Sequence, residues 1–137
     1  MIPQRIQRKR TAGFNLQAVS LALNGLPCVV VTRPTRWRNM FVVWRDDDRQ
    51  WTVSRGGCHY KPEQNTKESA QKLAVEKYRA EVYPDGPQHY RGFDPPPTQS
   101  DIIKGLRGRN VACFCAVDDP YCHGDVLLEL ANSRSHP

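Results

Sequence analysis

The sequence predicts a single α/β domain in which helices flank a small, mainly parallel sheet, with a β-hairpin added to it. Two short runs, 28–32 and 110–115, are rich in apolar and β-branched residues, which is typical of strands buried on both faces. Other segments repeat apolar residues at helical spacing. The length of 137 residues suits one domain. No apolar run approaches the ~20 residues that a membrane-spanning helix needs.

The first half of the chain is predicted to hold a helix, a strand and a hairpin. Asn15 suits the N-cap of a helix whose apolar positions recur at helical spacing, and Asn24-Gly25 is a stop signal. A β-branched run follows Pro27 and predicts a buried strand. In chain order, the predicted elements are a basic arm (1–14), a helix (15–24), a strand (28–32), a loop (33–39), and a hairpin of strands 40–44 and 51–54 around the turn 45–50.

The second half is predicted to combine three helices with one strand. Residues Asn65-Thr-Lys-Glu68 match a capping box at the start of a helix, and Ser100 suits the cap of a second, shorter helix. In chain order, the predicted elements are a helix reaching about Val82, a loop rich in proline and glycine (83–97), a helix (100–106), a strand (110–115), a loop (116–121) and a final helix (123–132).

Basic residues are concentrated in the first 55 positions. This segment has ten Lys/Arg and three Asp, a net charge of +7, whereas residues 56–137 have ten Lys/Arg and eleven Asp/Glu, a net charge of −1. Such an asymmetry favours a polyanionic partner, either a nucleic acid or a phosphorylated ligand. A solvated arm that only aids solubility is the alternative. The candidate nucleic-acid-binding residues of the arm are Arg5, Arg8, Lys9 and Arg10.

The five cysteines do not resemble a disulfide framework. Their number is odd, three of them fall between Cys113 and Cys122, and no secretory signal precedes them. We therefore expect reduced thiols and a cytoplasmic protein.

The segment around Cys122 and His123 is predicted to form a reactive or ligand-binding corner. It joins a strand to the start of a helix, where unpaired N–H groups lower the pKa of thiols and attract anions. Three interpretations remain open: a Zn²⁺ site, a metal-free site with Cys122 or His123 as nucleophile or acid/base, and buried thiols that only pack. The candidate metal ligands are Cys113, Cys115, Cys122 and His123, and the candidate catalytic residues are Cys122, His123 and Asp125.

The loop after the first predicted strand is the second candidate site. Guanidinium groups bind phosphate in a bidentate manner, and tryptophan can stack on a base. The candidate ligand-binding residues are Arg33, Arg36, Trp37 and Asn39. If the runs 28–32 and 110–115 are parallel neighbours, this loop and the Cys/His corner meet at one sheet edge. In the alternative interpretation, Trp37 is a core anchor and Arg36 pairs with Asp46 or Asp118.

Three stretches resemble an uncharacterised family of small bacterial and phage domains, classified as a domain of unknown function. They are a basic arm (3–14), an R-P-T-x-W segment (31–41) and the motif R-G-x-N-x-A-C-x-C…C-H-x-D-V-L-L-E-L-A-N (107–132). The family has Gly-Asn-Pro where this chain has Arg38-Asn39-Met40, and segment 45–65 is interpreted as an insertion. The resemblance implies an α/β fold and a phage or prokaryotic setting. It points to Arg33, Pro34, Trp37 and Asn39, and to Cys113, Cys115, Cys122, His123 and Asp125.

The function expected from these features is the binding of a nucleotide or nucleic-acid component, with any modification of it carried out at the Cys/His corner. No P-loop or Ser-His-Asp constellation is visible, so whether the chain is an enzyme stays open. One alternative is a non-enzymatic, Zn²⁺-stabilised DNA-binding or inhibitory protein. Another is a phage-type protein whose basic arm blocks a host factor in the prokaryotic cytoplasm.

Overall fold

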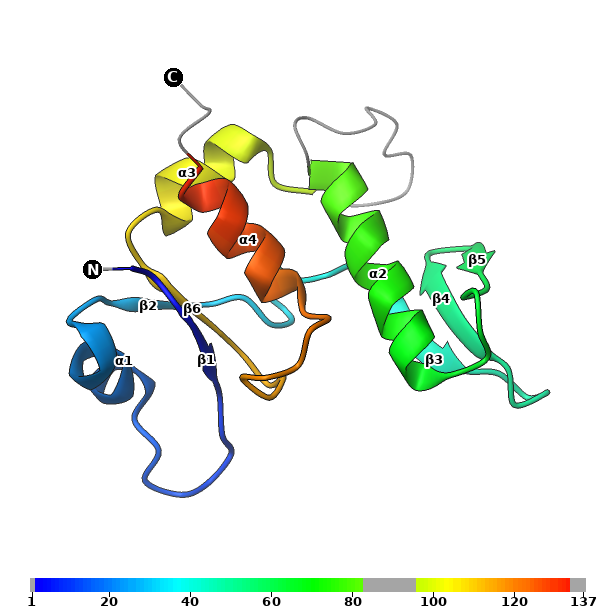
Figure 1. The fold of residues 1–137 in the computed structure, drawn as a ribbon, viewed down its shortest axis with the longest axis horizontal. Coiled ribbons are helices and arrows are strands. Elements are labelled where there is room, and N and C mark those ends of the chain that lie inside the picture. Colours follow the sequence, from blue (N-terminus) through cyan, green and yellow to red (C-terminus); the bar gives the residue numbers. More distant parts are fainter. Residues whose placement is uncertain (1, 83–95, 134–137) are drawn as a thin grey trace.

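Four helices and two three-stranded sheets make up the described part of the protein, a computed structural model that describes residues 2–82 and 96–133 (Figure 1). The mixed α/β class expected from the sequence is therefore confirmed. Most of the predicted loop 83–97 lies outside the described residues. In the described ranges, no helix has the length and apolar character required to cross a membrane.

The first sheet is parallel throughout and has the strand of the C-terminal motif at its centre. The order is β1 (Arg5–Gln7), β6 (Asn110–Cys113) and β2 (Cys28–Val30), and β6 pairs in parallel with both neighbours. All four residues of β6 are buried; three of them are apolar, and the fourth, Asn110, is a buried polar residue. The two apolar runs 28–32 and 110–115 are thus parallel neighbours, as the sequence suggested.

Part of the predicted basic arm over residues 1–14 is a strand, β1, which was not predicted from the sequence. Arg5 pairs with Val111 and Gln7 with Cys113, so three residues of the supposed arm form an edge strand. A single apolar residue, Ile6, lies between polar neighbours here, and a three-residue strand gives no periodicity to detect. The strand exists because β6 offers it an unpaired edge.

Helices cover both faces of the parallel sheet. Helix α1 (Leu16–Asn24) lies against β2, where Leu16 packs on Ile6, Cys28 and Ala112. Helices α3 (Gln99–Leu106) and α4 (His123–Ala131) pack together on the opposite face, where Val111 and Cys113 join the main core (Figure 1). Alternation along β6 therefore sends successive side chains into two different apolar clusters.

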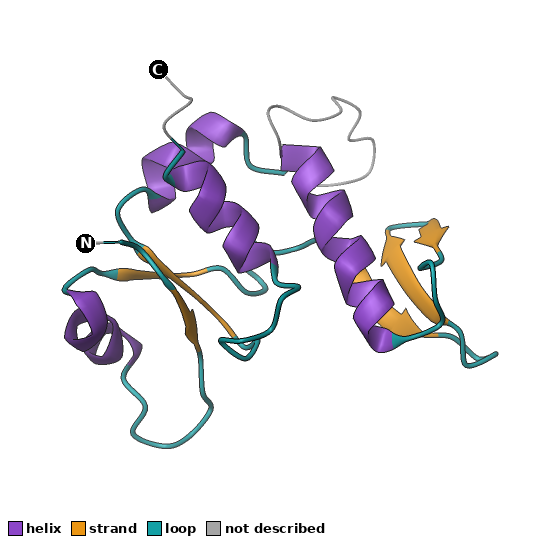
Figure 2. Ribbon diagram, viewed as in Figure 1, coloured by secondary structure: helices purple, strands orange, loops and turns teal. Residues whose placement is uncertain are grey.

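The second sheet is antiparallel, so the expectation of one mainly parallel sheet was incomplete. It consists of β3 (Val42–Arg45), β4 (Trp51–Arg55) and β5 (Cys58–Tyr60), in that order (Figure 2). The first two strands are the predicted hairpin. Gly56-Gly57 then forms a turn into a third strand, which was not predicted from the sequence. Helix α2 (Lys67–Val82) contacts both this sheet and α4, so Val53 and Tyr78 share one core with α4.

The helix caps agree with the sequence at α1 and differ by one or two residues elsewhere. Asn15 accepts from the Ala18 N–H, and Gly25 ends α1 in the left-handed conformation, as expected. Thr66, rather than Asn65, accepts from the backbone at the start of α2. Thr98, rather than Ser100, caps α3 in a reciprocal capping box with Asp101.

The capping box of α3 gives a testable difference between two neighbouring hydroxyl residues. Thr98→Ala removes the hydrogen bond from the Asp101 N–H at 3.1 Å and is expected to lower the free energy of unfolding by about 1 kcal/mol. Ser100→Ala, in the first turn and exposed, is expected to change it by less than about 0.5 kcal/mol. Urea denaturation of both variants checks this; equal losses would contradict the cap assignment.

Candidate functional site

A cleft opens where the three parallel strands end. Its volume is about 340 Å³. Thr32 and Arg33 come shortly after β2, Phe114 directly after β6, and Arg10 soon after β1. The carboxyl ends of parallel strands are where open α/β sheets bind ligands. The residues that line the cleft are Arg10, Thr32, Arg33, Asn39, Phe41, Phe114 and His123. The loop 33–39 and the start of α4 therefore meet at one cleft, as the sequence suggested for parallel neighbours.

The lining of this cleft is cationic and aromatic. Arg10 and Arg33 are exposed, and none of the lining residues is acidic. Phe114 is 38% exposed, although it follows a buried strand. The guanidinium carbons of Arg8 and Arg10 lie 4.7 Å and 4.4 Å from its centroid. These contacts place positive charge around an accessible ring.

Hydrogen bonds hold the walls of the cleft in place. Arg8 donates to the Thr32 hydroxyl at 2.7 Å, which joins the segment after β1 to the segment after β2. The Asn39 amide donates to the Ala74 carbonyl of α2 and accepts from the Phe41 N–H at 2.9 Å. Asn39 is thus a residue that fixes the loop, and its backbone carbonyl accepts a hydrogen bond from Arg33 at 3.3 Å.

His123 contributes a neutral, oriented imidazole to the wall. Its Nε2 donates to the Val31 carbonyl at 2.9 Å, because a carbonyl oxygen can only accept. The ring is edge-on to Tyr78, with centroids 5.3 Å apart. Burial lowers the pKa of His123 below its ordinary value, while the backbone of Val31 and the charge of Cys113 act in the opposite direction. The imidazole is therefore mainly uncharged at neutral pH.

Trp37 and Arg36 lie outside the cleft, which corrects their assignment as ligand-binding residues. Trp37 is only 9% exposed and belongs to the main core. Its ring lies so close to Gly105 that a Cβ there would be 2.6 Å from Cζ2. Arg36 pairs with Asp101 of α3 at 3.0 Å, rather than with Asp46 or Asp118. Trp37 is thus a core anchor, the alternative that the sequence left open.

Three thiols gather beside the cleft. The sulfurs of Cys113 and Cys122 are 3.2 Å apart, and those of Cys113, Cys115 and Cys122 all lie within 4.8 Å of one another. A straight strand would hold the sulfurs of Cys113 and Cys115 further apart. Strand β6, however, ends at Cys113 and the chain bends at the next two residues. His123 is not part of this group, because its ring turns to Val31.

Arg5 is buried against the thiols, which corrects its assignment to a nucleic-acid-binding arm. Its guanidinium lies 3.8 Å from the Cys113 sulfur and donates to the carbonyls of Ala116, Val117 and Asp119 at 2.8–3.0 Å. Its Nε donates to Asp125 at 3.0 Å. Asp125, expected to be catalytic, therefore holds Arg5 and does not line the cleft. Lys9 is exposed.

The thiols form one electrostatic unit. Donation from Cys115 and Cys122, with a further bond from Arg5, lowers the pKa of Cys113 well below its ordinary value. Cys115 and Cys122 would lose these hydrogen bonds if they lost their protons. The bonds therefore raise the pKa of Cys115 to about 11 and also raise the pKa of Cys122. These bonds and the nearby Arg5 cation favour negative charge on Cys113 over Cys115 and Cys122.

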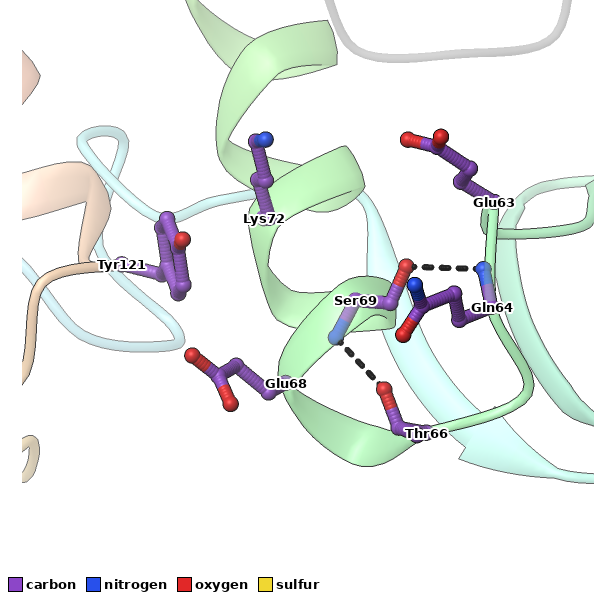
Figure 3. A pocket seen from close by; sticks show the side chains of 7 residues that line it. All are labelled: Glu63, Gln64, Thr66, Glu68, Ser69, Lys72 and Tyr121. Atoms are coloured by element: carbon purple, nitrogen blue, oxygen red, sulfur yellow. Dashed lines mark hydrogen bonds between the residues drawn. The ribbon is translucent and has the colours of Figure 1, made fainter.

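A second cavity, of about 230 Å³, lies at the start of α2 (Figure 3). Tyr121, from the loop before α4, closes the side opposite the segment 63–72. Two carboxylates, Glu63 and Glu68, accompany one lysine, Lys72, and the nearby Ser69 bonds to Gln64 and Thr66. The one sequence motif at this cavity, the capping box of residues 65–68, predicts a helix start and no ligand. The carboxylates make the cavity less suited to an anion than the first cleft is.

The sequence missed Thr32, Phe41 and Phe114 as lining residues. Phe114 carried a usable signal, since alternation sends it away from Cys113 and Cys115, and an aromatic residue then falls beside the arginines. Thr32 and Phe41 carried none, because each lies at the edge of an apolar run and reads as part of the core.

Comparison with known proteins identifies the family but no activity. The chain belongs to the family described as Domain of unknown function (DUF4326), whose model matches residues 7–133. The resemblance drawn from the sequence motifs is confirmed in this respect. All cleft-lining residues and the three clustered thiols fall within the matched range. No curated protein and no solved structure matches the chain.

Proposed function

We propose that this DUF4326 chain binds a nucleotide, either free or as one unit of a nucleic acid, in the cleft at the carboxyl ends of the parallel strands. The observation that carries the proposal is the convergence of Arg10, Arg33 and the accessible Phe114 ring on one acid-free cleft. Cations suit the phosphate and an aromatic face suits the base.

The phosphate is assigned to the arginine side of the cleft. Arg33 makes one hydrogen bond of 3.3 Å to the Asn39 carbonyl, and Arg10 stacks on Phe114. Neither guanidinium forms an ion pair among the described residues. Their N–H groups can therefore turn to phosphate oxygens in bidentate pairs. The positive charge of the first 55 residues assists association with such an anion.

The base is assigned to Phe114, and the size of the cleft limits the ligand. A stacked base contributes roughly 1–3 kcal/mol in proteins that bind single strands. The volume of about 340 Å³ lies at the lower end of the range for ligand pockets. One nucleotide fits this space better than a dinucleotide cofactor does.

The proposal covers binding and assigns no chemical step. Cys122 and Asp125 do not line the cleft, and the His123 Nε2 is engaged by Val31. His123 shapes the wall and its hydrogen bond fixes the first turn of α4 against the end of β2.

Arg33→Gln is expected to weaken ADP binding by roughly tenfold or more, because it removes charge-assisted hydrogen bonds of about 1.5–3 kcal/mol. Isothermal titration at low salt with ADP, adenosine, inorganic phosphate and a short single-stranded DNA measures this. Adenosine is expected to bind the wild type more weakly than ADP does, and Arg33→Gln is expected to leave the affinity for adenosine unchanged. Stronger binding of the DNA than of ADP would identify the nucleotide as a unit of a strand.

The matched control is Arg109→Gln, which removes the same charge at the opposite end of β6. Arg109 donates to the Gly105 carbonyl and precedes the first residue of that strand. Its replacement is expected to change ADP affinity by less than about twofold. The proposal fails if the wild type binds neither ADP nor DNA, or if both arginine variants lose affinity equally.

A further inference from the structure

The three-thiol group and its buried arginine do not line the proposed nucleotide cleft. Cys113 and Cys122 are buried and Cys115 is half-buried, yet a guanidinium lies beside them. Thiols that only pack as small apolar groups would favour an apolar neighbour instead of a cation. The arrangement therefore points to negative charge on the sulfurs.

We propose that Cys113, Cys115 and Cys122 bind one Zn²⁺ through their sulfurs, without His123. Two sulfurs on a tetrahedral Zn²⁺, with Zn–S bonds of ~2.3 Å, lie roughly 3.8 Å apart. The Cys113 and Cys122 sulfurs are 3.2 Å apart and no pair of the three sulfurs is more than 4.8 Å apart, so small shifts bring them to this value. A thiolate-only donor set selects thiophilic cations over Mg²⁺ or Ca²⁺.

The position of Cys122 supports a ligand role independently of the distances. It is the N-cap of α4, a position that favours Ser, Thr, Asp or Asn, and its side chain makes no capping hydrogen bond. Its extended backbone, with φ −136° and ψ 132°, is followed by His123 as the first helical residue, whose ring points elsewhere. The sulfur is thus directed to the other thiols at the expense of a helix cap.

Arg5 acts as the outer-shell partner of this site. It fixes the loop between Cys115 and Cys122 through three backbone carbonyls and lies 3.8 Å from the Cys113 sulfur. A Zn²⁺ with three thiolates has a net charge of −1, which the guanidinium offsets. Outer-shell groups of this kind orient ligands and tune metal affinity. Binding releases the remaining thiol protons to solvent.

Three protein ligands leave one position of the tetrahedron for water or an anion, the pattern of zinc sites that exchange a ligand. Cys115 is the only one of the three thiols that is not buried, so solvent reaches the site on its side. The site is distinct from the nucleotide cleft, since none of the three cysteines lines that cleft.

The test measures metal alone, with no nucleotide present. Full-length protein is purified with reductant, and a chelator removes any bound metal. Its affinity for Zn²⁺ is then measured in competition with a chromophoric chelator, and the number of bound metal ions is measured by mass spectrometry. We expect one Zn²⁺ per chain. Cd²⁺ substitution is expected to give thiolate charge-transfer absorption that decreases in Cys115→Ser. The affinity loss in this variant is expected to exceed the roughly 10- to 100-fold caused by losing an outer-shell partner.

Two controls separate the ligand set from its neighbours. Cys58→Ser changes an exposed cysteine of β5 and is expected to keep one Zn²⁺ with affinity within about twofold. His123→Gln removes the hydrogen bond to Val31 but no proposed ligand, and it is expected to keep one Zn²⁺ per chain. Absence of Zn²⁺ from correctly folded wild type would overturn the proposal. Loss of Zn²⁺ in His123→Gln would also overturn it. A third contrary result would be a Cys113–Cys122 disulfide that forms in protein purified without reductant even when Zn²⁺ is in excess.

Discussion

Replacing Arg5 with methionine is expected to lower the free energy of unfolding by about 3 kcal/mol, because breaking a hydrogen-bonded ionic contact of a buried charge has effects of this size. The side chain of Arg5 is 5% exposed and bonds to Asp125 and to three carbonyls of the loop before α4. Methionine retains the apolar stem but leaves all four acceptors without this donor. Part of the loss is recovered by water, because Asp125 and most of the loop are exposed.

Chemical denaturation measures the Arg5 effect, and Arg8→Met is its control. Arg8 is also basic and follows the same strand, but within residues 2–82 and 96–133 its side chain makes one hydrogen bond, to Thr32, and contacts Phe114. Its replacement is expected to have an effect of about 1 kcal/mol or less. Equal losses for the two variants would show that Arg5 acts only through general charge and would contradict its structural role.

Asn110→Ala is expected to destabilise the protein by roughly 3 kcal/mol, since each buried polar group left without a partner costs about 1–3 kcal/mol. Asn110 is fully buried and exchanges two hydrogen bonds with Asn24, at 2.8 and 2.9 Å. It also accepts from the Gln4 N–H and donates to Ser20. One amide thereby joins the chain before β1, helix α1 and strand β6.

The control for this prediction is Asn65→Ala, which removes an exposed amide that accepts from the Trp51 N–H. Its expected effect is below about 1 kcal/mol. Urea denaturation with a fluorescence readout compares the two variants. A loss of less than about 1 kcal/mol for Asn110→Ala would mean that water replaces the network and that it does not fix the sheet.

The sequence predicted the elements with strong local signals. Helix α1 has both a cap and a glycine stop, β2 and β6 lie in runs rich in apolar and β-branched residues, and α4 has a regular apolar stripe. Each of these signals depends on a residue and its neighbours within one or two turns, so pattern alone is sufficient.

The remaining features depend on contacts between distant segments. Strand β1 forms only because β6, more than 100 residues away, pairs with it, and Arg5 becomes buried for the same reason. Contacts with α3 and α2 place Trp37 in the core. The sequence of the loop 33–39 does not indicate either contact. The thiols converge because β6 ends two residues before its predicted end. Local periodicity contains none of this information.

Mapping ADP onto the ¹⁵N-labelled protein by NMR tests the binding cleft most directly. The account predicts that the amide signals of Arg10, Thr32, Arg33, Phe114 and His123 shift together and saturably, while those of the cavity at the start of α2 stay in place. Shifts confined to residues 63–72 and Tyr121, or no saturable shifts in any part of the chain, would contradict it.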